Sequence, residues 1–316
     1  MLFDRLFLAF FVRLAMSLTN SVDNSVSILG MGAMGSTLAK TLLQNGYPVT
    51  VWNRSPERCV ALASAGATVA VDIANAVTGS QLIIICMIDK LAAEAVLHDL
   101  HDSLDLQGRT IVNLSTGTVA DVKRICSFVE RHNGIYLDGG IMCYPKDIGG
   151  LNTAILYSGN HAAYTLHEST LRVLAGNPKY LGPDPTTCTP TYLALYAFYF
   201  GALAAWLEGA VLASSAGVTP QAFEQLSPIM IEMLADGIKT ASDRIKDDNY
   251  GGDQASVDVH VAGQEIVRDA LRSANAPYAA TDAFLTYCNM AQKKAWASKT
   301  SLRCSAPCTP DIALFD

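Results

Sequence analysis

The pattern of apolar and polar positions divides the chain into two parts near residue 187. In the first part, short apolar runs alternate with segments whose apolar residues recur at helical spacing, as in VSIL and the glycine turn and helix that follow it. Runs such as LIIIC are typical of strands buried on both faces, which predicts an α/β domain with a doubly wound parallel sheet of the Rossmann type. Besides VSIL and VTVW, the pattern predicts strands at 67–71, 81–87, 110–115, 134–142 and 153–159.

The second part is predicted to be all-helical. Pro183, Pro185 and Pro190 mark its start, and a long apolar segment, 189–218, follows as an interdomain helix. Such a helical domain is thin on its own, so we expect a second copy to pack against it in an intertwined homodimer. Further helices are expected at 220–240, 256–274 and 279–297, with a break suggested at Gly237 and a polar loop at 243–253.

The segment 189–218 is apolar enough to raise the question of a membrane helix. Glu208 lies near its middle, where a charge is expensive in lipid, and no basic flank follows the segment. Small residues dominate one of its sides, which suits close helix packing in a soluble protein. We therefore predict a buried central helix and no membrane, with the membrane helix as the alternative.

The N-terminus precedes the regular pattern. Its apolar core, Leu6 to Val12, is too short to span a bilayer, and no signal-peptide cleavage site follows it. The arginines at 5 and 13 leave an organelle-targeting helix as the alternative to an extension outside the fold. The predicted segments are an N-terminal extension 1–24, a cofactor-binding domain 25–187, a helical dimerisation and substrate domain 188–298, and a tail 299–316.

Composition favours a soluble, cytoplasmic enzyme or binding protein. The 316 residues include 22 Lys and Arg against 29 Asp and Glu, and the net charge of −7 gives no electrostatic reason to bind nucleic acid or an anionic membrane. The eight cysteines lack paired CxxC spacing, so we expect reduced thiols and no metal. For Cys304 and Cys308, a disordered tail is preferred over a metal pair.

The glycine turn after VSIL predicts dinucleotide binding. Gly30, Gly32 and Gly35 form G-x-G-x-x-G between a strand and a helix. The first glycine permits the tight turn, the second lets the backbone approach a pyrophosphate, and the third allows close packing at a helix N-terminus that attracts the anion. The predicted cofactor contacts in this turn are Gly30, Met31, Gly32, Ala33, Met34 and Gly35.

The end of the next strand favours NADPH over NADH. An NAD site usually has Asp or Glu here for the ribose hydroxyls, whereas this chain has Asn53, followed by Arg54, Ser55 and Arg58. The arginines can bind a 2′-phosphate through charged hydrogen bonds, and Ser55 can both donate to the phosphate and cap a helix. A solvated basic turn is the alternative.

The carboxyl ends of the later strands are predicted to lie near the nicotinamide, because ligands of such sheets bind at this edge. These ends place Met87, Ile88, Ser115, Thr116 and a turn at 139–145 there. The structural alternatives are that Ser115 and Thr116 cap a helix starting near Val119, and that Gly139–Gly140 forms only a turn.

Several motifs together indicate a family. ILGMGAMGSTLA, VTVWNRS, NLSTGT, YLDGGIM, ILYSG and KYLGPD occur in this order. They resemble the NADPH-dependent imine reductases and reductive aminases, relatives of the β-hydroxyacid dehydrogenases, over about residues 25–295. The resemblance implies an oxidoreductase that transfers a hydride from NADPH to the C=N bond of an imine or iminium ion, with a small-molecule imine, or an amine and a carbonyl compound, as substrate.

The resemblance also singles out Tyr192. The β-hydroxyacid dehydrogenases carry a catalytic lysine early on the interdomain helix, whereas TPTYLALYAF contains none. The imine reductases place Asp, or in a subgroup Tyr, just before LAL, and Tyr192 occupies that position. A phenol, with an ordinary pKa of about 10, can donate a proton to nitrogen or hydrogen-bond the amine product. We expect Tyr192 to act as proton donor or anchor.

Other substrate contacts are implied less directly. His260 is the second catalytic candidate: it occupies the position where related reductive aminases often have a substrate-facing Gln, and a partly buried histidine facing a dimer neighbour is its alternative role. Tyr196 and Phe200, with Tyr199 nearby, are predicted to line an aromatic pocket for a cationic substrate, with core packing as the alternative. Met142, in the YLDGGIM motif, completes the predicted substrate contacts.

Two other functions stay open at this point. The chain could be an NADP-dependent β-hydroxyacid or aldehyde reductase, against which the missing lysine argues. It could also bind NADPH without turnover, as a sensor or scaffold. Neither the native substrate, nor the preferred face, nor catalysis of imine formation follows from the sequence.

Overall fold

The computed structural model describes residues 24–100, 105–249 and 255–293. The chain divides into two compact units between Leu195 and Tyr196, inside helix α8 (Cys188–Ser215), and each unit is described by itself. The predicted tail, and all of the predicted extension except Asn24, lie outside the described residues.

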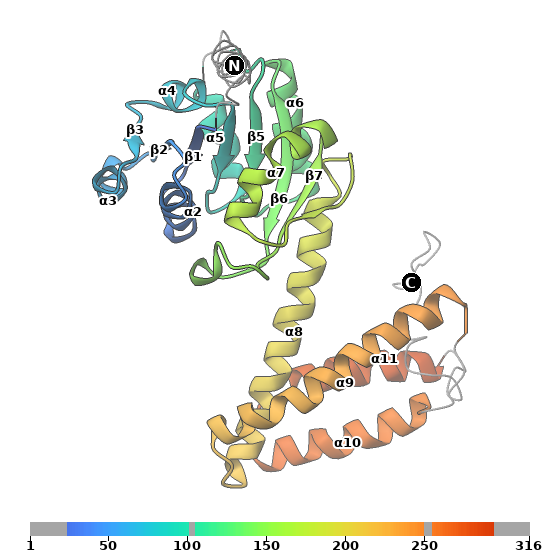
Figure 1. The fold of residues 1–316 in the computed structure, drawn as a ribbon. Helices are drawn as coiled ribbons and strands as arrows, with labels where there is room; N and C mark the ends of the chain where they lie inside the picture. The colour runs from blue at the N-terminus through green and yellow to red at the C-terminus, as the bar shows by residue number, and fades with distance from the viewer. Residues whose placement is uncertain (1–23, 101–104, 250–254, 294–316) are drawn as a thin grey trace, which may run out of the picture. The chain divides into compact units, whose positions relative to one another are not determined.

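A mixed sheet forms the centre of the first unit (Figure 1). In the described part of the chain it has eight strands in the order β3-β2-β1-β4-β5-β6-β7-β8. The direction of winding reverses between β1 and β4, which is the place where open α/β sheets bind ligands. The strands are β1 (Val26–Leu29), β2 (Val49–Trp52), β3 (Thr68–Val69), β4 (Leu82–Ile85), β5 (Thr110–Asn113), β6 (Ile135–Ile141), β7 (Ile155–Gly159) and β8 (Lys179–Tyr180).

The predicted strands are present, with one departure from a parallel sheet: β6 and β7 are antiparallel. Their connection contains only the short 3-10 helix η2 (Pro145–Asp147) in place of a crossover helix, so the chain reverses direction. The crossover helix α7 (His161–Leu174) follows β7 and leads to β8, which pairs with β7 in parallel. The sequence pattern did not predict β8, which has only two residues.

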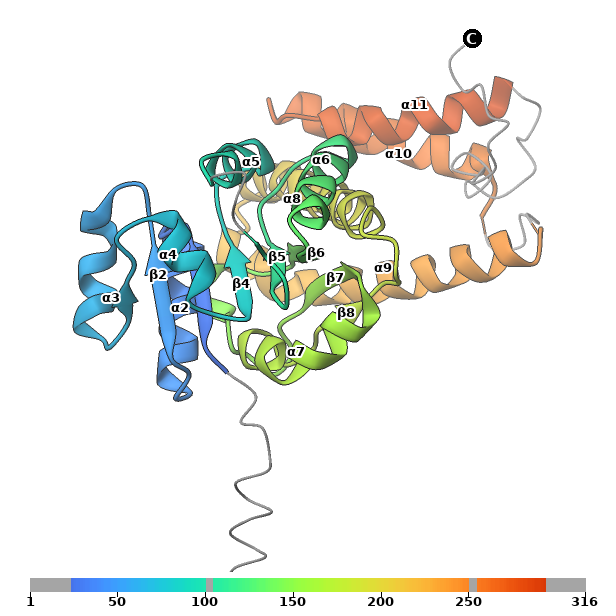
Figure 2. The same ribbon diagram turned by 90° about the horizontal axis from the view of Figure 1, so that it is seen from above.

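Helices cover both faces of this sheet (Figure 2). Apolar residues of α2 (Ala33–Gln44) and α7 build the core on one face. Those of α4 (Ile73–Thr78), α5 (Lys90–His98) and α6 (Val119–Arg131) build the core on the other. The 3-10 helix η1 (Pro56–Cys59) and α3 (Val60–Ser64) follow β2. This burial on both faces explains the continuous apolar strands in the sequence.

Three helices follow α8 in the described part of the second unit: α9 (Pro220–Lys246), α10 (Val257–Ser273) and α11 (Ala279–Lys293). The suggested break at Gly237 is wrong, because α9 continues through it to Lys246. A single glycine weakens a helix interior by only about 1 kcal/mol relative to alanine, which a helix this long tolerates. Any continuation of α11 past Lys293 falls outside the described residues.

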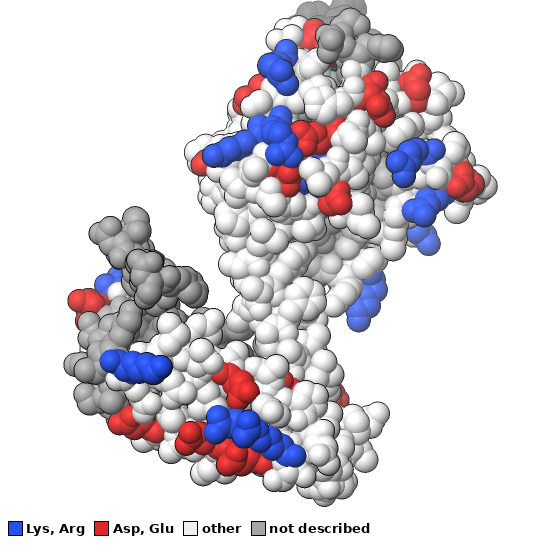
Figure 3. All heavy atoms as spheres, turned by 180° about the vertical axis from the view of Figure 1, so that it is seen from behind, with Lys and Arg blue, Asp and Glu red and all other residues white. Residues whose placement is uncertain are grey.

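Helix α8 is largely exposed within one chain. Among the described residues it alone is long and apolar enough to cross a membrane. This is weak evidence for a membrane helix, because core helices of soluble proteins have the same length and composition. Only 6% of its most apolar stretch is buried. Phe198, Phe200 and Leu207 are about half exposed, and the surface along α8 carries almost no charged atoms in the view of Figure 3. One chain therefore does not provide the predicted burial of this helix.

Candidate active site

The glycine turn has the geometry of an anion cradle. Gly30 has a φ of 103°, and a Cβ at this position would collide with the carbonyl oxygen of Cys86 at the end of β4. Gly35 is similarly restricted, because its Cβ would collide with the carbonyl oxygen of Gly30. Gly32 begins α2 without a side-chain cap, and a Cβ there would meet no heavy atom within 4 Å. The N–H groups of the first turn of α2 are thus left for an anion such as a pyrophosphate.

Asn53 joins this turn to the end of β2. Its Oδ1 accepts a hydrogen bond from the Met31 N–H at 2.9 Å, and its Nδ2 donates to the Ser55 carbonyl at 3.0 Å. Arg54 and Arg58 are exposed beside it. Ser55 occupies the predicted N-cap position of η1, but its side chain makes no capping hydrogen bond there. Two cations and a hydroxyl follow β2, and Asn53 stands where an NAD site usually has a carboxylate, so these residues fit a 2′-phosphate although Glu57 lies between them.

The carboxyl ends of β4 and β5 are tied together through Ser115. The Met87 N–H donates to Ser115 Oγ at 3.0 Å, and the Ser115 N–H donates to Asn113 Oδ1 at 2.9 Å. Ser115 is buried, whereas Ile88 and Thr116 are exposed. Ser115 therefore holds the edge together, and Ile88 and Thr116 are open to solvent.

Neither structural alternative proposed for these residues is found. A different residue, Thr118, caps α6 in a reciprocal capping box with Asp121. Gly139 and Gly140 lie within β6, so the predicted turn begins only after Ile141. Met142, just past the strand, is half-buried, and its N–H donates to the Ala154 carbonyl at 3.1 Å.

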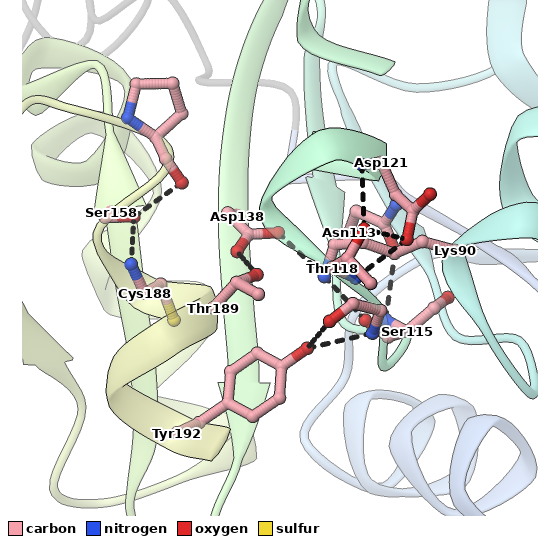
Figure 4. A network of polar contacts seen from close by, with 12 residues as sticks. Lys90, Asn113, Ser115, Thr118, Asp121, Asp138, Ser158, Cys188, Thr189 and Tyr192 are labelled. Atoms are coloured by element: carbon pink, nitrogen blue, oxygen red, sulfur yellow. Dashed lines mark hydrogen bonds and ion pairs between the residues drawn. The ribbon is translucent and has the colours of Figure 1, made fainter. Parts of the chain in front are cut away.

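Tyr192 packs against β6 and the turn after β5. A Cβ on Gly140 would lie 2.5 Å from Tyr192 Cδ1, so only glycine leaves room for the ring. The Tyr192 hydroxyl accepts a hydrogen bond from the Gly117 N–H at 3.0 Å and donates to the Gly117 carbonyl at 3.3 Å (Figure 4). Tyr192 is only 1% exposed. To donate its proton to a substrate, the Tyr192 hydroxyl must therefore give up its 3.3 Å hydrogen bond to the Gly117 carbonyl.

A buried ion pair, which the sequence reasoning missed, lies beside Tyr192. Lys90 Nζ is 3.0 Å from Asp138 Oδ1, and both side chains have 0% exposure. Lys90 Nζ also donates to the Ser115 carbonyl at 2.7 Å and lies 5.5 Å from the centroid of the Tyr192 ring. Burial raises the pKa of Asp138 above its ordinary value, while Lys90 and hydrogen bonds from Thr189 and Tyr136 oppose that rise. The available signal was an aspartate inside the otherwise apolar strand 134–142.

Comparison with known proteins agrees with this architecture. Residues 25–182 match the NAD-binding domain of 6-phosphogluconate dehydrogenase, and residues 184–301 match the C-terminal domain of NADPH-dependent reductive aminase-like proteins. An NADPH-dependent reductive aminase from Aspergillus oryzae is 32% identical over 248 residues, which cover 77% of this chain and 83% of that protein.

Solved structures agree as well. An imine reductase from Pseudomonas sp. is 65% identical with a TM-score of 0.88, over 90% of this chain and 98% of that one. A reductive aminase from Aspergillus terreus in complex with NADPH and ethyl levulinate is 28% identical with a TM-score of 0.84, over 89% and 98% of the two chains. The chain belongs to the imine reductase and reductive aminase family. The family predicted from the motifs is thereby confirmed.

The remaining family positions lie in the second unit. The rings of Tyr196 and Phe200 are 6.1 Å apart and tilted, and Tyr199 meets Phe200 edge-on at 5.2 Å. These rings contact one another along α8, and the aromatic pocket that they are expected to line stays a prediction. His260 is half-buried on α10 and lies edge-on to Phe284 of α11 at 6.1 Å. Their roles toward a substrate stay predictions.

Within residues 24–100, 105–249 and 255–293, no group of three or more His, Cys, Asp or Glu side chains is placed to hold a metal ion. Burial raises the pKa of the Cys86 thiol to about 12, so this cysteine is not poised as a thiolate. Cys304 and Cys308 lie outside the described residues.

Proposed function

We propose that this protein is an NADPH-dependent imine reductase in which Tyr192 is the proton donor or the anchor for the substrate nitrogen. The observation that carries the proposal is the Tyr192 hydroxyl held on the backbone of Gly117, which follows β5. Because β1, β4 and β5 are parallel, this hydroxyl lies at the same edge of the sheet as the glycine turn.

The cofactor is held by the glycine turn and the end of β2. The first turn of α2, from Gly32 onward, binds the pyrophosphate, and Arg54, Ser55 and Arg58 bind the 2′-phosphate. When bound, NADPH supplies the hydride that reduces the C=N carbon. The exposed Ile88 and Thr116, together with Met87, contact the nicotinamide end.

Tyr192 then donates a proton to the substrate nitrogen or orients that nitrogen. If the imine is neutral, the hydroxyl turns its proton from the Gly117 carbonyl to the substrate nitrogen, while the Gly117 N–H keeps its hydrogen bond to the phenolic oxygen. That N–H stabilises the negative charge that develops on oxygen as the proton leaves. If an iminium ion arrives already protonated, the same hydroxyl orients the nitrogen instead.

A hydroxyacid or aldehyde reductase is disfavoured by the position of the lysines. The segment 188–195 of α8 contains none. Lys90 comes near Tyr192 from another element, but it is fully buried and paired with Asp138. Lys90 is therefore held in the ion pair, and α8 offers no lysine at the position of the β-hydroxyacid dehydrogenase lysine. The Aspergillus terreus relative, solved with NADPH and a keto ester, supports an amine and a carbonyl compound as substrates.

We further propose that the protein is a cytoplasmic homodimer. Helix α9 presents an exposed apolar surface, and large exposed apolar patches mark interfaces. A second copy would cover this surface and α8, which is uncharged over most of its length. The exposed apolar residues of α9 are Leu226, Ile229, Met230, Ile231, Met233, Leu234, Ile238 and Ile245.

The test is NADPH oxidation, with NADH as control. The substrates are a cyclic pyrroline-type imine, a ketone with an excess of amine, and a β-hydroxyacid with NADP+ in the reverse direction. We expect imine-dependent NADPH loss that falls about 100-fold or more in Tyr192→Phe, the range that general acid catalysis supplies. Hydroxyacid oxidation alone would overturn the assignment, and NADPH binding without turnover of any substrate would favour a sensor.

A further inference from the structure

The Lys90–Asp138 pair is unusual among the described ion pairs because neither side chain is exposed at all. The other described pairs, such as Arg172–Glu168, all involve exposed or partly exposed side chains. Burying two charges brings a desolvation penalty that their attraction often fails to offset, so such a pair is weak evidence for stability. The contacts of Lys90 and Asp138 indicate a role other than stabilising the fold.

Lys90 fixes the turn on which the Tyr192 hydroxyl rests. Its main-chain N–H donates to the Thr116 carbonyl at 2.7 Å, and its Nζ donates to the Ser115 carbonyl at 2.7 Å. Its methylene groups pack against Gly117, where an added Cβ would lie 2.7–2.8 Å from Lys90 Cβ, Cγ and Cδ. One residue thus determines the position of three consecutive residues.

Asp138 fixes the other partner, the start of α8. Its Oδ2 accepts a hydrogen bond from Thr189 at 2.6 Å, and its Oδ1 accepts one from the Tyr136 hydroxyl at 3.1 Å. Thr189 lies one turn before Tyr192 and therefore on the same face of the helix. Asp138 and Gly140 are two residues apart in β6 and therefore lie on the same face of the sheet. Asp138 binds Thr189, and Gly140 leaves room for the ring of Tyr192.

We propose that Lys90 and Asp138 are positioning residues for Tyr192: their ion pair locks the 115–117 turn to the first turns of α8 and so fixes the direction in which the hydroxyl presents its proton. Figure 4 shows Thr189 and Tyr192 pointing from α8 toward these groups. Both charges are held by protein groups, Lys90 by the Ser115 carbonyl and Asp138 by Thr189 and Tyr136, so neither is assigned a contact with substrate. The inference rests on the proposed function of Tyr192.

The test is a kinetic cycle. Lys90→Met and the double variant Lys90→Met/Asp138→Asn are each made with Tyr192 and with Tyr192→Phe, and imine reduction is measured under NADPH saturation. With Tyr192 present we expect kcat to fall about 10-fold to 100-fold with KM for the imine nearly unchanged, the size of effect that follows from a misplaced catalytic group. With Tyr192→Phe, the same substitutions should change kcat less than about 2-fold, because the group that they position is gone. Arg172→Met, which breaks a surface ion pair on α7, is the matched control and should leave kcat and KM unchanged.

A second readout uses cofactor-free protein. The double variant leaves no unpaired buried charge, so it keeps the test available even if Lys90→Met alone folds poorly. Hydrogen–deuterium exchange of a peptide containing Gly117 should speed up in the double variant, even where its melting temperature equals that of the parent, because the ammonium group that holds the turn is gone.

The outcomes separate the two proposals. An equal loss of kcat in the parent and in the Tyr192→Phe background, or unchanged exchange at Gly117, overturns the positioning role alone. If Tyr192→Phe itself leaves kcat unchanged, the proposed role of Tyr192 fails, and the positioning role fails with it. A loss confined to the Tyr192 background, together with faster exchange, supports both.

Discussion

The stability of Lys90→Met in cofactor-free protein gives a direct thermodynamic test of the buried pair. The substitution removes the ammonium group and keeps most of the apolar stem. Asp138, with 0% exposure, then loses its cationic partner and retains only the hydrogen bonds from Thr189 and Tyr136. Removing one partner of a buried pair typically lowers the free energy of unfolding by about 3–5 kcal/mol, because the remaining charge is uncompensated.

The size of this loss depends on pH, and its sign follows from Asp138. Burial already raises the pKa of Asp138 above its ordinary value of 3.8, and Lys90 is the largest influence opposing that rise, so Lys90→Met raises the pKa further. A carboxyl whose pKa is higher in the folded state binds its proton more tightly there, so stability falls as pH rises from the unfolded pKa to the folded one. Between these two pKa values, each pH unit lowers the free energy of unfolding by about 1.4 kcal/mol. We therefore expect a smaller loss at pH 5 than at pH 8.

Urea unfolding followed by circular dichroism at the two pH values provides the assay, with Arg172→Met as the surface control. The double variant Lys90→Met/Asp138→Asn should recover most of the loss and show no added dependence on pH, because no buried carboxylate remains. A loss for Lys90→Met below about 1 kcal/mol, or an equal loss at pH 5 and pH 8, would refute the assignment of a buried charged pair.

Three further outcomes are expected. Gly140→Ala forces a methyl group into the Tyr192 ring and should lower kcat about 10-fold or more in steady-state kinetics, and an unchanged kcat would show that the ring position does not matter. Arg54→Ala should raise KM for NADPH about 10-fold and leave KM for NADH nearly unchanged, and equal effects on both cofactors would exclude contact with the 2′-phosphate. Met233→Asp should shift the mass measured by light scattering from dimer to monomer, and an unchanged dimer would exclude α9 from the interface.

The parts that the sequence pattern predicted are those with local causes. The strand, turn and helix around Gly30 are specified within about twenty residues, because the apolar period, the glycine conformations and the helix end are each readable in place. The same holds for strand 82–85, which is a continuous apolar run, and for strand 110–113, whose centre is apolar; both are buried on both faces.

The parts that failed depend on contacts between distant segments or on weak local signals. The antiparallel β6–β7 pair depends on a connection that lacks a crossover helix, and α9 runs through Gly237 because one glycine does not end a helix this long. The Lys90–Asp138 pair joins residues from different elements, and neither residue alone indicates the other. Tyr192 was found only through family motifs, and its burial against Gly140 became visible only in three dimensions.

The buried pair also explains why a neutral side chain suits position 192 in this chain. Lys90 Nζ lies 5.5 Å from the Tyr192 ring, and Asp138 already neutralises it. An aspartate at 192 would bring a second anion to one cation, and two carboxylates that share a site cannot both ionise easily, so one would stay protonated. A lysine there would add a second cation to one anion. A phenol adds a proton donor and leaves the charge of the pair balanced. We therefore expect that exchanging Tyr192 for a charged residue, without altering the Lys90–Asp138 pair, disturbs the pair as well.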